Sequence, residues 1–298
     1  MPRICLLVVC LALVACGGEA DPRAPLPAPK VDLSPSDRAD WAPGGPLRER
    51  IPVLAYRSAV DPIAFAREMT LLHSAGYRTI SLATLIDYLR GRPVALPPRP
   101  FVLTFDDGRL DAWRASDATL RRLGFRAALF IDAGRVDKGD PAYLRWSELD
   151  ALQRSGDWEI QLEAGTGKHL MRWGPSPRDV GSFYTYRGTE EVVFGWRERV
   201  FGDLAWGERM LKYRIRGYEP LAFAPAYGNY GQIGTNDPRI PRLLLPRLLG
   251  SFPLVFVQDR SPFAVRGAGT SSPVGRLQVT SERDLQALNT SGIFSKDA

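Results

Sequence analysis

The stretch Phe101-Val-Leu-Thr-Phe-Asp-Asp-Gly108 determines how this sequence is interpreted. Apolar and β-branched residues run directly into two aspartates and a glycine, which predicts a buried strand that ends in a charged pair. Burying two neighbouring carboxylates is costly, and a metal ion, a substrate or a basic group would offset the cost. At the carboxyl end of a barrel strand such residues usually belong to an active site, whereas the alternative is an ordinary surface turn.

Strand and helix patterns alternate on both sides of this stretch, which favours a parallel α/β architecture. Ser147 is expected to cap one of the helices. Strands are predicted at residues 52–56, 77–81, 101–105, 127–131, 158–162, 221–224, 254–258 and 277–279, and helices at 62–74, 82–90, 110–123, 148–154, 195–216, 241–249 and 281–288.

Residues 165–194 interrupt the alternation, because they are rich in Gly, Pro, Arg and aromatic residues. We expect a long irregular insertion that forms one wall of a cleft, since long loops in compact domains are often functional. Trp173, Tyr184 and Tyr186 would then be available to stack on a sugar. The alternative is that these rings pack within the loop itself.

The N-terminus predicts an extracytoplasmic address. Residues 1–15 have the charge and apolar run of a signal peptide, and Leu13-Val-Ala-Cys16 resembles a bacterial lipobox, in which Cys16 is acylated after cleavage. An ordinary secretory signal is the alternative. Residues 16–50 are rich in proline and are predicted to be a tether, followed by one domain over residues 51–298. We therefore expect a lipid-anchored protein of the cell envelope, at the outer membrane if the host has one.

Charge and cysteine content exclude several classes of protein. The chain carries 39 Lys and Arg against 33 Asp and Glu, a formal net charge of +6, but the basic residues are scattered. Nucleic acid is therefore a poor partner, and we expect a monomer. Two of the three cysteines lie in the predicted signal peptide, so the mature chain can form no internal disulfide and no cysteine-based zinc site.

Several segments, taken in order, resemble the polysaccharide deacetylase family, the NodB-homology domain, over about residues 51–288. The resemblance implies a deformed (β/α) barrel that removes acetyl groups from polysaccharides of the cell envelope or biofilm, usually with a divalent metal. The matching segments are Ile51-Pro-Val-Leu-Ala-Tyr56, Gly76-Tyr-Arg-Thr-Ile-Ser81, Thr104-Phe-Asp-Asp-Gly108, Trp158-Glu-Ile160 and Pro225-Ala-Tyr-Gly228.

The resemblance assigns roles to particular residues. It implies that Asp106 is the catalytic base and that Asp107 binds the metal, with Zn²⁺ preferred over Mn²⁺ or Co²⁺. Two histidines complete the family's metal site, but here their positions are matched by Glu163 and His169. The substrate-binding residues expected around this centre are Arg57, Tyr227, Asn229 and Trp173.

The departures from the family leave three functions open. The chain has only two histidines, and we expect the other one, His73, to be structural. A site of Asp107, Glu163 and His169 would make a slow metal-dependent deacetylase. Alternatively, the guanidinium of Arg57 replaces the metal and leaves a carbohydrate-binding protein without hydrolysis. The third possibility is a glycoside hydrolase with Glu163 as the acid.

Overall fold

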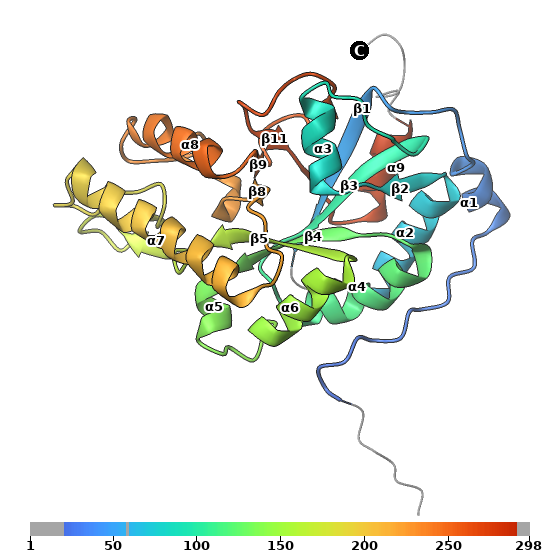
Figure 1. The fold of residues 1–298 in the computed structure, drawn as a ribbon, viewed down its shortest axis with the longest axis horizontal. Helices are drawn as coiled ribbons and strands as arrows, with labels where there is room; N and C mark the ends of the chain where they lie inside the picture. The colour runs from blue at the N-terminus through green and yellow to red at the C-terminus, as the bar shows by residue number, and fades with distance from the viewer. Residues whose placement is uncertain (1–20, 58–59, 291–298) are drawn as a thin grey trace, which may run out of the picture.

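The fold is a ten-stranded sheet that curves into a nearly closed barrel, as a computed structural model describes it for residues 21–57 and 60–290 (Figure 1). The expected deformed (β/α) barrel is therefore confirmed. Its parallel strands follow one another in the order β1 (Arg50–Tyr56), β3 (Arg99–Phe105), β4 (Ala127–Asp132), β5 (Trp158–Ala164), β8 (Ala222–Phe223), β9 (Leu254–Val257) and β11 (Val274–Gly275).

The ring is completed by a short strand that comes almost directly after β11. This strand, β12 (Leu277–Gln278), pairs in parallel with β1, while β11 pairs with β9. Arg276 is the one residue between β11 and β12, so it lies at the seam where the barrel closes. Two further strands extend the sheet: β10 (Phe263–Val265) is antiparallel to β1, and β2 (Tyr77–Thr79) is parallel to β3.

Helices cover the outside of the sheet (Figure 1). The predicted bounds of two of them are confirmed, α2 (Pro62–Ser74) and α4 (Leu110–Leu123). The others are α1 (Pro35–Asp40), α3 (Leu82–Leu89), α5 (Ala133–Asp137), α6 (Trp146–Ser155), α7 (Val193–Arg214), α8 (Ile240–Ser251) and α9 (Glu282–Thr290), with a 3-10 turn at Ala226–Gly228.

The alternation of side chains along β3 directs the first aspartate into the barrel. Leu103 and Phe105 belong to the hydrophobic cluster that packs against the outer helices, whereas Val102 belongs to the cluster on the inner face. Because successive side chains of a strand point to opposite faces, Thr104 and Asp106 continue the inner row. The strand pattern therefore positions Asp106 inside the mouth of the barrel.

The predicted cap of α6 is wrong. The helix begins at Trp146, with Arg145 rather than Ser147 in the cap position. The carboxylate of Glu148 accepts a hydrogen bond of 2.6 Å from the backbone N–H of Arg145, so the acidic side chain of the first turn satisfies this end of the helix.

The described part of the predicted tether packs on the domain instead of extending from it. The side chain of Arg23 forms an ion pair of 2.6 Å with Glu148, and the backbone N–H of Leu26 donates to the carbonyl oxygen of Arg114. Trp41 is only 2% exposed, since burying its large apolar ring removes a large hydrophobic area from water. Residues 1–20, including Cys16, lie outside the described residues. Within the described part of the chain, no helix combines the length and apolar character needed to cross a bilayer.

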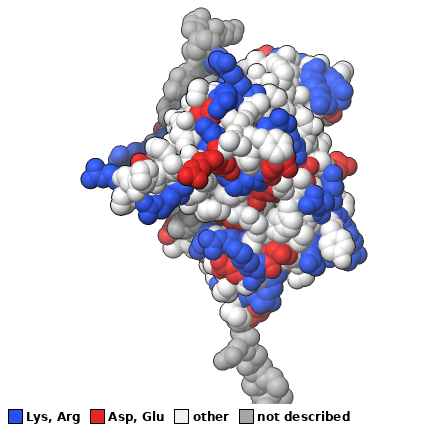
Figure 2. All heavy atoms as spheres, turned by 90° about the vertical axis from the view of Figure 1, so that its left-hand side faces the viewer, with Lys and Arg blue, Asp and Glu red and all other residues white. Residues whose placement is uncertain are grey.

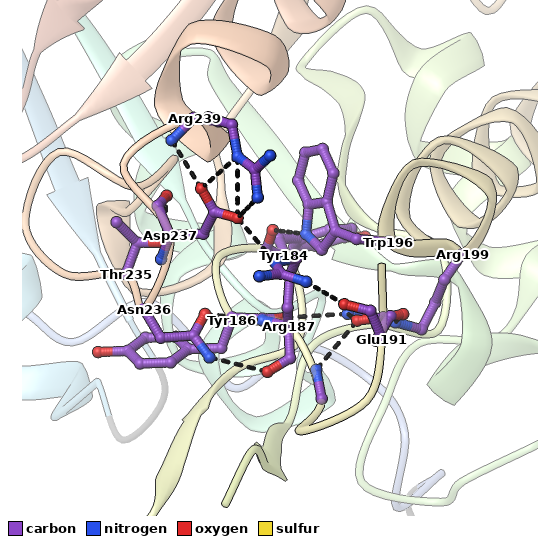
Figure 3. Close-up of polar contacts among 11 residues, drawn as sticks. Tyr184, Tyr186, Arg187, Glu191, Trp196, Arg199, Thr235, Asn236, Asp237 and Arg239 are labelled. Carbon is purple, nitrogen blue, oxygen red and sulfur yellow. Dashed lines mark hydrogen bonds and ion pairs between the residues drawn. The ribbon is translucent and has the colours of Figure 1, made fainter. Parts of the chain in front are cut away.

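The insertion at residues 165–194 is more regular than predicted. It contains an antiparallel hairpin of β6 (Leu170–Arg172) and β7 (Val180–Ser182). Polar contacts tie the segment after the hairpin to the rest of the molecule (Figure 3). Arg187 forms an ion pair of 2.8 Å with Asp237, and Arg199 of α7 forms one of 2.7 Å with Glu191. The hairpin and these ion pairs therefore hold the insertion in a defined position on the domain.

Candidate active site

The loop after β3 sends its two aspartates in different directions. Asp106 is 2% exposed and continues the inner row of the strand. Asp107 has a φ of 79°, a left-handed conformation that is uncommon for any residue but glycine. Its backbone N–H donates a hydrogen bond of 3.0 Å to the carboxylate of Glu163, which lies at the end of β5. The carboxyl ends of β3 and β5 thus bring three carboxylates to the same mouth of the barrel.

A buried arginine neutralises Asp106. The two terminal nitrogens of Arg276 donate to Oδ1 and Oδ2 of Asp106 at 2.6 and 2.9 Å, and the two side chains are 1% and 3% exposed. The guanidinium also donates to the hydroxyl of Thr104 at 3.1 Å. It lies 5.4 Å from the ring of Phe130 and 5.8 Å from that of Phe256, so aromatic faces as well as oxygens surround it. A bidentate pair of this kind fixes the orientation of the carboxylate.

A lysine bridges the other two carboxylates. The Nζ atom of Lys168 lies 2.6 Å from Oε1 of Glu163 and also contacts Oδ1 of Asp107. Burial raises the pKa of Glu163 well above its usual range, and the charge of Asp106 raises it further. Burial also lowers the pKa of Lys168, to about 8. The ammonium therefore compensates two carboxylates that would otherwise be buried together.

His169 does not join this cluster. Its side chain is exposed, its Nδ1 atom lies 3.2 Å from the carbonyl oxygen of Thr166, and its ring packs 5.0 Å from that of Phe183. Among residues 21–57 and 60–290, no group of three or more His, Cys, Asp or Glu side chains is placed to hold a metal ion. The ammonium of Lys168 lies between Asp107 and Glu163 instead. The residues present, as they are arranged, do not fit the divalent metal that the resemblance implies.

Two predicted substrate residues lie at the mouth of the barrel. The Nε atom of Arg57 is 3.7 Å from Oδ2 of Asp106, and the arginine side chain is 43% exposed. Tyr227 is 45% exposed and has a positive φ of 62°. Burial raises the pKa of Tyr227, and the negative charge of Glu163 raises it further. Arg57 and Tyr227 are thus available to contact a ligand.

The side chain of Asn229, predicted to bind substrate, is engaged by its own loop and by the insertion. Its Nδ2 donates to the carbonyl oxygen of Gly234 at 2.9 Å and to the hydroxyl of Thr185 at 3.2 Å. Its Oδ1 accepts from the backbone N–H of Gly231 at 2.8 Å. Both the oxygen and the nitrogen of the Asn229 amide are thus hydrogen-bonded within the protein, and the residue is only 8% exposed.

Two of the three aromatic rings singled out in the insertion keep part of their surface exposed. Trp173 and Tyr186 are half-buried, and their ring centroids lie 5.9 Å apart. Tyr184 is 1% exposed and its hydroxyl donates to Asp203 at 2.6 Å, so the expectation that it stacks on a sugar is wrong. Figure 3 shows Tyr184 among the residues whose polar contacts hold the insertion in place.

Two cavities adjoin the charged centre. One of about 460 Å³ is lined by Arg57, Tyr56, Glu68 and Gln278 among others. Another of about 310 Å³ is lined by Asp132, Arg135, Lys138, Thr166, Lys168 and His169.

The surface at the α7 and α8 end carries interspersed basic and acidic side chains, with no continuous basic field (Figure 2).

Sequence reasoning missed the two cations that dominate the site. Lys168 adjoins His169 in the segment that matches the family's metal site, so its position could have been flagged. Arg276 carries no such indication, because it lies between two short strands far from Asp106 in the sequence. Arg57, the guanidinium expected to pair with the carboxylates, makes only the longer contact to Asp106.

Comparisons with known proteins agree with this architecture. Residues 94–233 match the family model described as polysaccharide deacetylase. The chain is 27% identical over 199 residues to YxkH of Bacillus subtilis (strain 168), whose name assigns it to the polysaccharide deacetylases; the match covers 60% of this chain and 68% of YxkH.

Solved structures show the same fold. The similar structures include a de-N-acetylase from Aggregatibacter actinomycetemcomitans, with 19% identity, a TM-score of 0.64, and 77% of this chain and 95% of that chain covered. IcaB from Ammonifex degensii has 23% identity and a TM-score of 0.61, with 83% and 98% covered. The Thr-Phe-Asp-Asp-Gly strand end thus lies within the residues that match the polysaccharide deacetylase family model, and the barrel around it is similar in fold to that of the solved de-N-acetylase.

Proposed function

We propose that the protein removes acetyl groups from an amino-sugar polysaccharide of the cell envelope or biofilm. The observation that carries the proposal is the placement of Asp106 at the carboxyl end of β3, oriented by Arg276 and bordered by Arg57 at the mouth of the barrel. The family match and the fold shared with a de-N-acetylase support it. Trp173 and Tyr186 pack against each other and are half-buried, and the proposal has a sugar stack on the part of these rings that stays exposed.

In the proposed reaction Asp106 acts as the base that accepts a proton from the attacking water. When the oxygen of a water molecule adds to the acetyl carbonyl carbon, the carboxylate of Asp106 takes the proton that the water loses. The carbon–nitrogen bond then breaks, and the amine nitrogen takes the proton that Asp106 had accepted, which regenerates the carboxylate. The acetyl group leaves as acetic acid and ionises to acetate in water. Arg276 keeps both oxygens of Asp106 in place, so the base is oriented before the substrate arrives.

The charge that develops on the carbonyl oxygen is weakly compensated in this site. In the family a divalent metal supplies the compensating charge, but the arrangement around Asp107 and Glu163 does not fit one. Lys168 is already shared by two carboxylates. An ammonium compensated in this way stabilises an oxyanion less than an uncompensated cation. We therefore expect slow hydrolysis.

Binding without hydrolysis is the second candidate. It is favoured by the pairing of Lys168 and Arg276 with the carboxylates, which leaves the centre with no strong electrophile among the described residues. Nothing in the described geometry favours a glycoside hydrolase. Its proposed acid, Glu163, is 3% exposed and engaged by Lys168 and by the amide of Asp107.

Acetate release tests the proposal. We expect slow release from β-1,4- and β-1,6-linked N-acetylglucosamine oligomers by the wild-type chain. Glu163→His removes one of the carboxylates that hold Lys168 and adds an imidazole, so release in the presence of Zn²⁺, Mn²⁺ or Co²⁺ should rise about tenfold, a barrier change of about 1.4 kcal/mol. Bound oligomers with no acetate from either protein would favour the binding candidate. Shortened oligomers would favour the glycoside hydrolase.

The proposed address is the cell envelope, through lipid on Cys16. We expect the full chain to fractionate with membranes when it is expressed in a bacterial host. Cys16→Ser should move it to the aqueous fraction, because no acyl chain can then be attached. A wild-type protein found wholly in the aqueous fraction would contradict the lipid anchor, and with it the outer-membrane location proposed for a diderm host.

A further inference from the structure

We infer that Lys168 is the resident cation of this site, and that its ammonium holds Asp107 and Glu163 together in a way that excludes a divalent metal. The inference goes beyond the proposed function, because it concerns what the carboxylates bind and holds whether or not acetate is released.

The three side chains form a closed and largely buried unit. The ammonium lies 2.6 Å from Glu163 and in contact with Asp107, and the exposed fractions of the Lys168, Asp107 and Glu163 side chains are 18%, 15% and 4%. The second oxygen of the glutamate is also used, since Oε2 accepts the backbone N–H of Asp107 at 3.0 Å. Three of the four oxygens of the two carboxylates therefore contact the ammonium or accept the backbone N–H.

Charge and chain geometry make the two cations mutually exclusive. A divalent ion between the carboxylates would occupy the space of the ammonium and repel it, so Lys168 would have to leave its buried position. Lys168 and His169 are adjacent, and the structure turns the lysine toward the carboxylates while the imidazole packs on Phe183. His169, the side chain that could complete a metal site, therefore points away from Asp107 and Glu163 while Lys168 contacts them.

Removing the ammonium is the direct test. The wild-type chain, Lys168→Met and the control Lys138→Met are stripped with chelator and titrated with Zn²⁺, Mn²⁺ and Co²⁺, and bound metal is measured by calorimetry and elemental analysis. Met keeps the apolar stem of the lysine without its charge. Lys138 and Lys168 line the same cavity, so the control matches Lys168 in residue type and neighbourhood. The ammonium that pairs with Asp107 and Glu163 is that of Lys168. We expect Lys168→Met to bind metal at least about tenfold more tightly than the other two proteins, about 1.4 kcal/mol.

Thermal stability supplies a second readout. Without its ammonium the carboxylate pair is uncompensated, so Lys168→Met should melt at a lower temperature than wild type and regain the loss when metal is added. Lys168→Arg keeps the charge and should stay metal-free. If Lys168→Met folds only in the presence of metal, that rescue itself supports the inference.

Two results would overturn the inference. One is a wild-type chain that binds about one divalent ion with the same affinity as Lys168→Met. The other is a Lys168→Met protein that gains neither metal affinity nor metal-dependent stability. Acetate release enters neither comparison, so a failure of the proposed function would be recognised separately, by the absence of acetate from every variant.

Discussion

Arg276→Met should lower the free energy of unfolding by about 3–5 kcal/mol, because it leaves the carboxylate of Asp106 buried without its partner. The guanidinium lies at the seam between β11 and β12 and makes both of its short contacts inside the barrel. Met fills part of the same volume, so the loss should reflect the unpaired charge and the missing hydrogen bonds more than a cavity. Urea unfolding followed by circular dichroism measures it.

Two comparisons make this result specific. Arg266→Met, which alters an exposed arginine, should change the stability by no more than about 0.5 kcal/mol. Arg276→Met combined with Asp106→Asn removes the buried charge as well, so the double variant should recover part of the stability. If Arg276→Met loses less than about 1 kcal/mol, the buried pair does not stabilise the barrel in the way its geometry indicates.

Asp106→Asn should reduce acetate release by about 10²–10⁴-fold, the usual contribution of a general base. The amide of asparagine cannot take the proton of the attacking water, whereas its shape preserves most contacts of the mouth. We expect the affinity for N-acetylglucosamine oligomers to change little, since Trp173, Tyr186 and Tyr227 are untouched. Initial rates and oligomer binding, measured on the same preparation, check both statements.

The matched control is Asp111→Asn, which alters a carboxylate of the same loop region. Asp111 lies in the first turn of α4, is 49% exposed and pairs with Arg109, so its loss should leave the rate nearly unchanged. Because Asp106→Asn also weakens the pair with Arg276, rates are compared below the melting temperature of the variant. An unchanged rate in folded Asp106→Asn would remove Asp106 from the role of base.

Local patterns were sufficient to predict most of the barrel. The bounds of α2 and α4 follow from the periodicity of their apolar residues. Thr104-Phe-Asp-Asp-Gly108 identifies a strand end, and it lies within the residues that match the polysaccharide deacetylase family model. The alternation along β3 also accounts for the inward position of Asp106. These features depend on residues that are close in the sequence, and for that reason the chain reveals them without its folded form.

Contacts between segments that are far apart in the sequence depend on the tertiary structure, and local patterns do not predict them. Arg276 reaches Asp106 across 170 positions, and it does so only because β12 pairs with β1 and closes the ring. Asn229 also contacts a distant segment, since its Nδ2 donates to the hydroxyl of Thr185, 44 positions away in the insertion.

The identity of the cation in the site is also decided by the tertiary structure. Sequence spacing leaves Lys168 and His169 as neighbours on one loop, and either side chain could have turned toward Asp107 and Glu163. The path of the loop after β5, where His169 packs on Phe183, selects the lysine. Composition and periodicity describe each segment separately, whereas the charge that compensates a buried carboxylate depends on which segments the fold brings together in three dimensions.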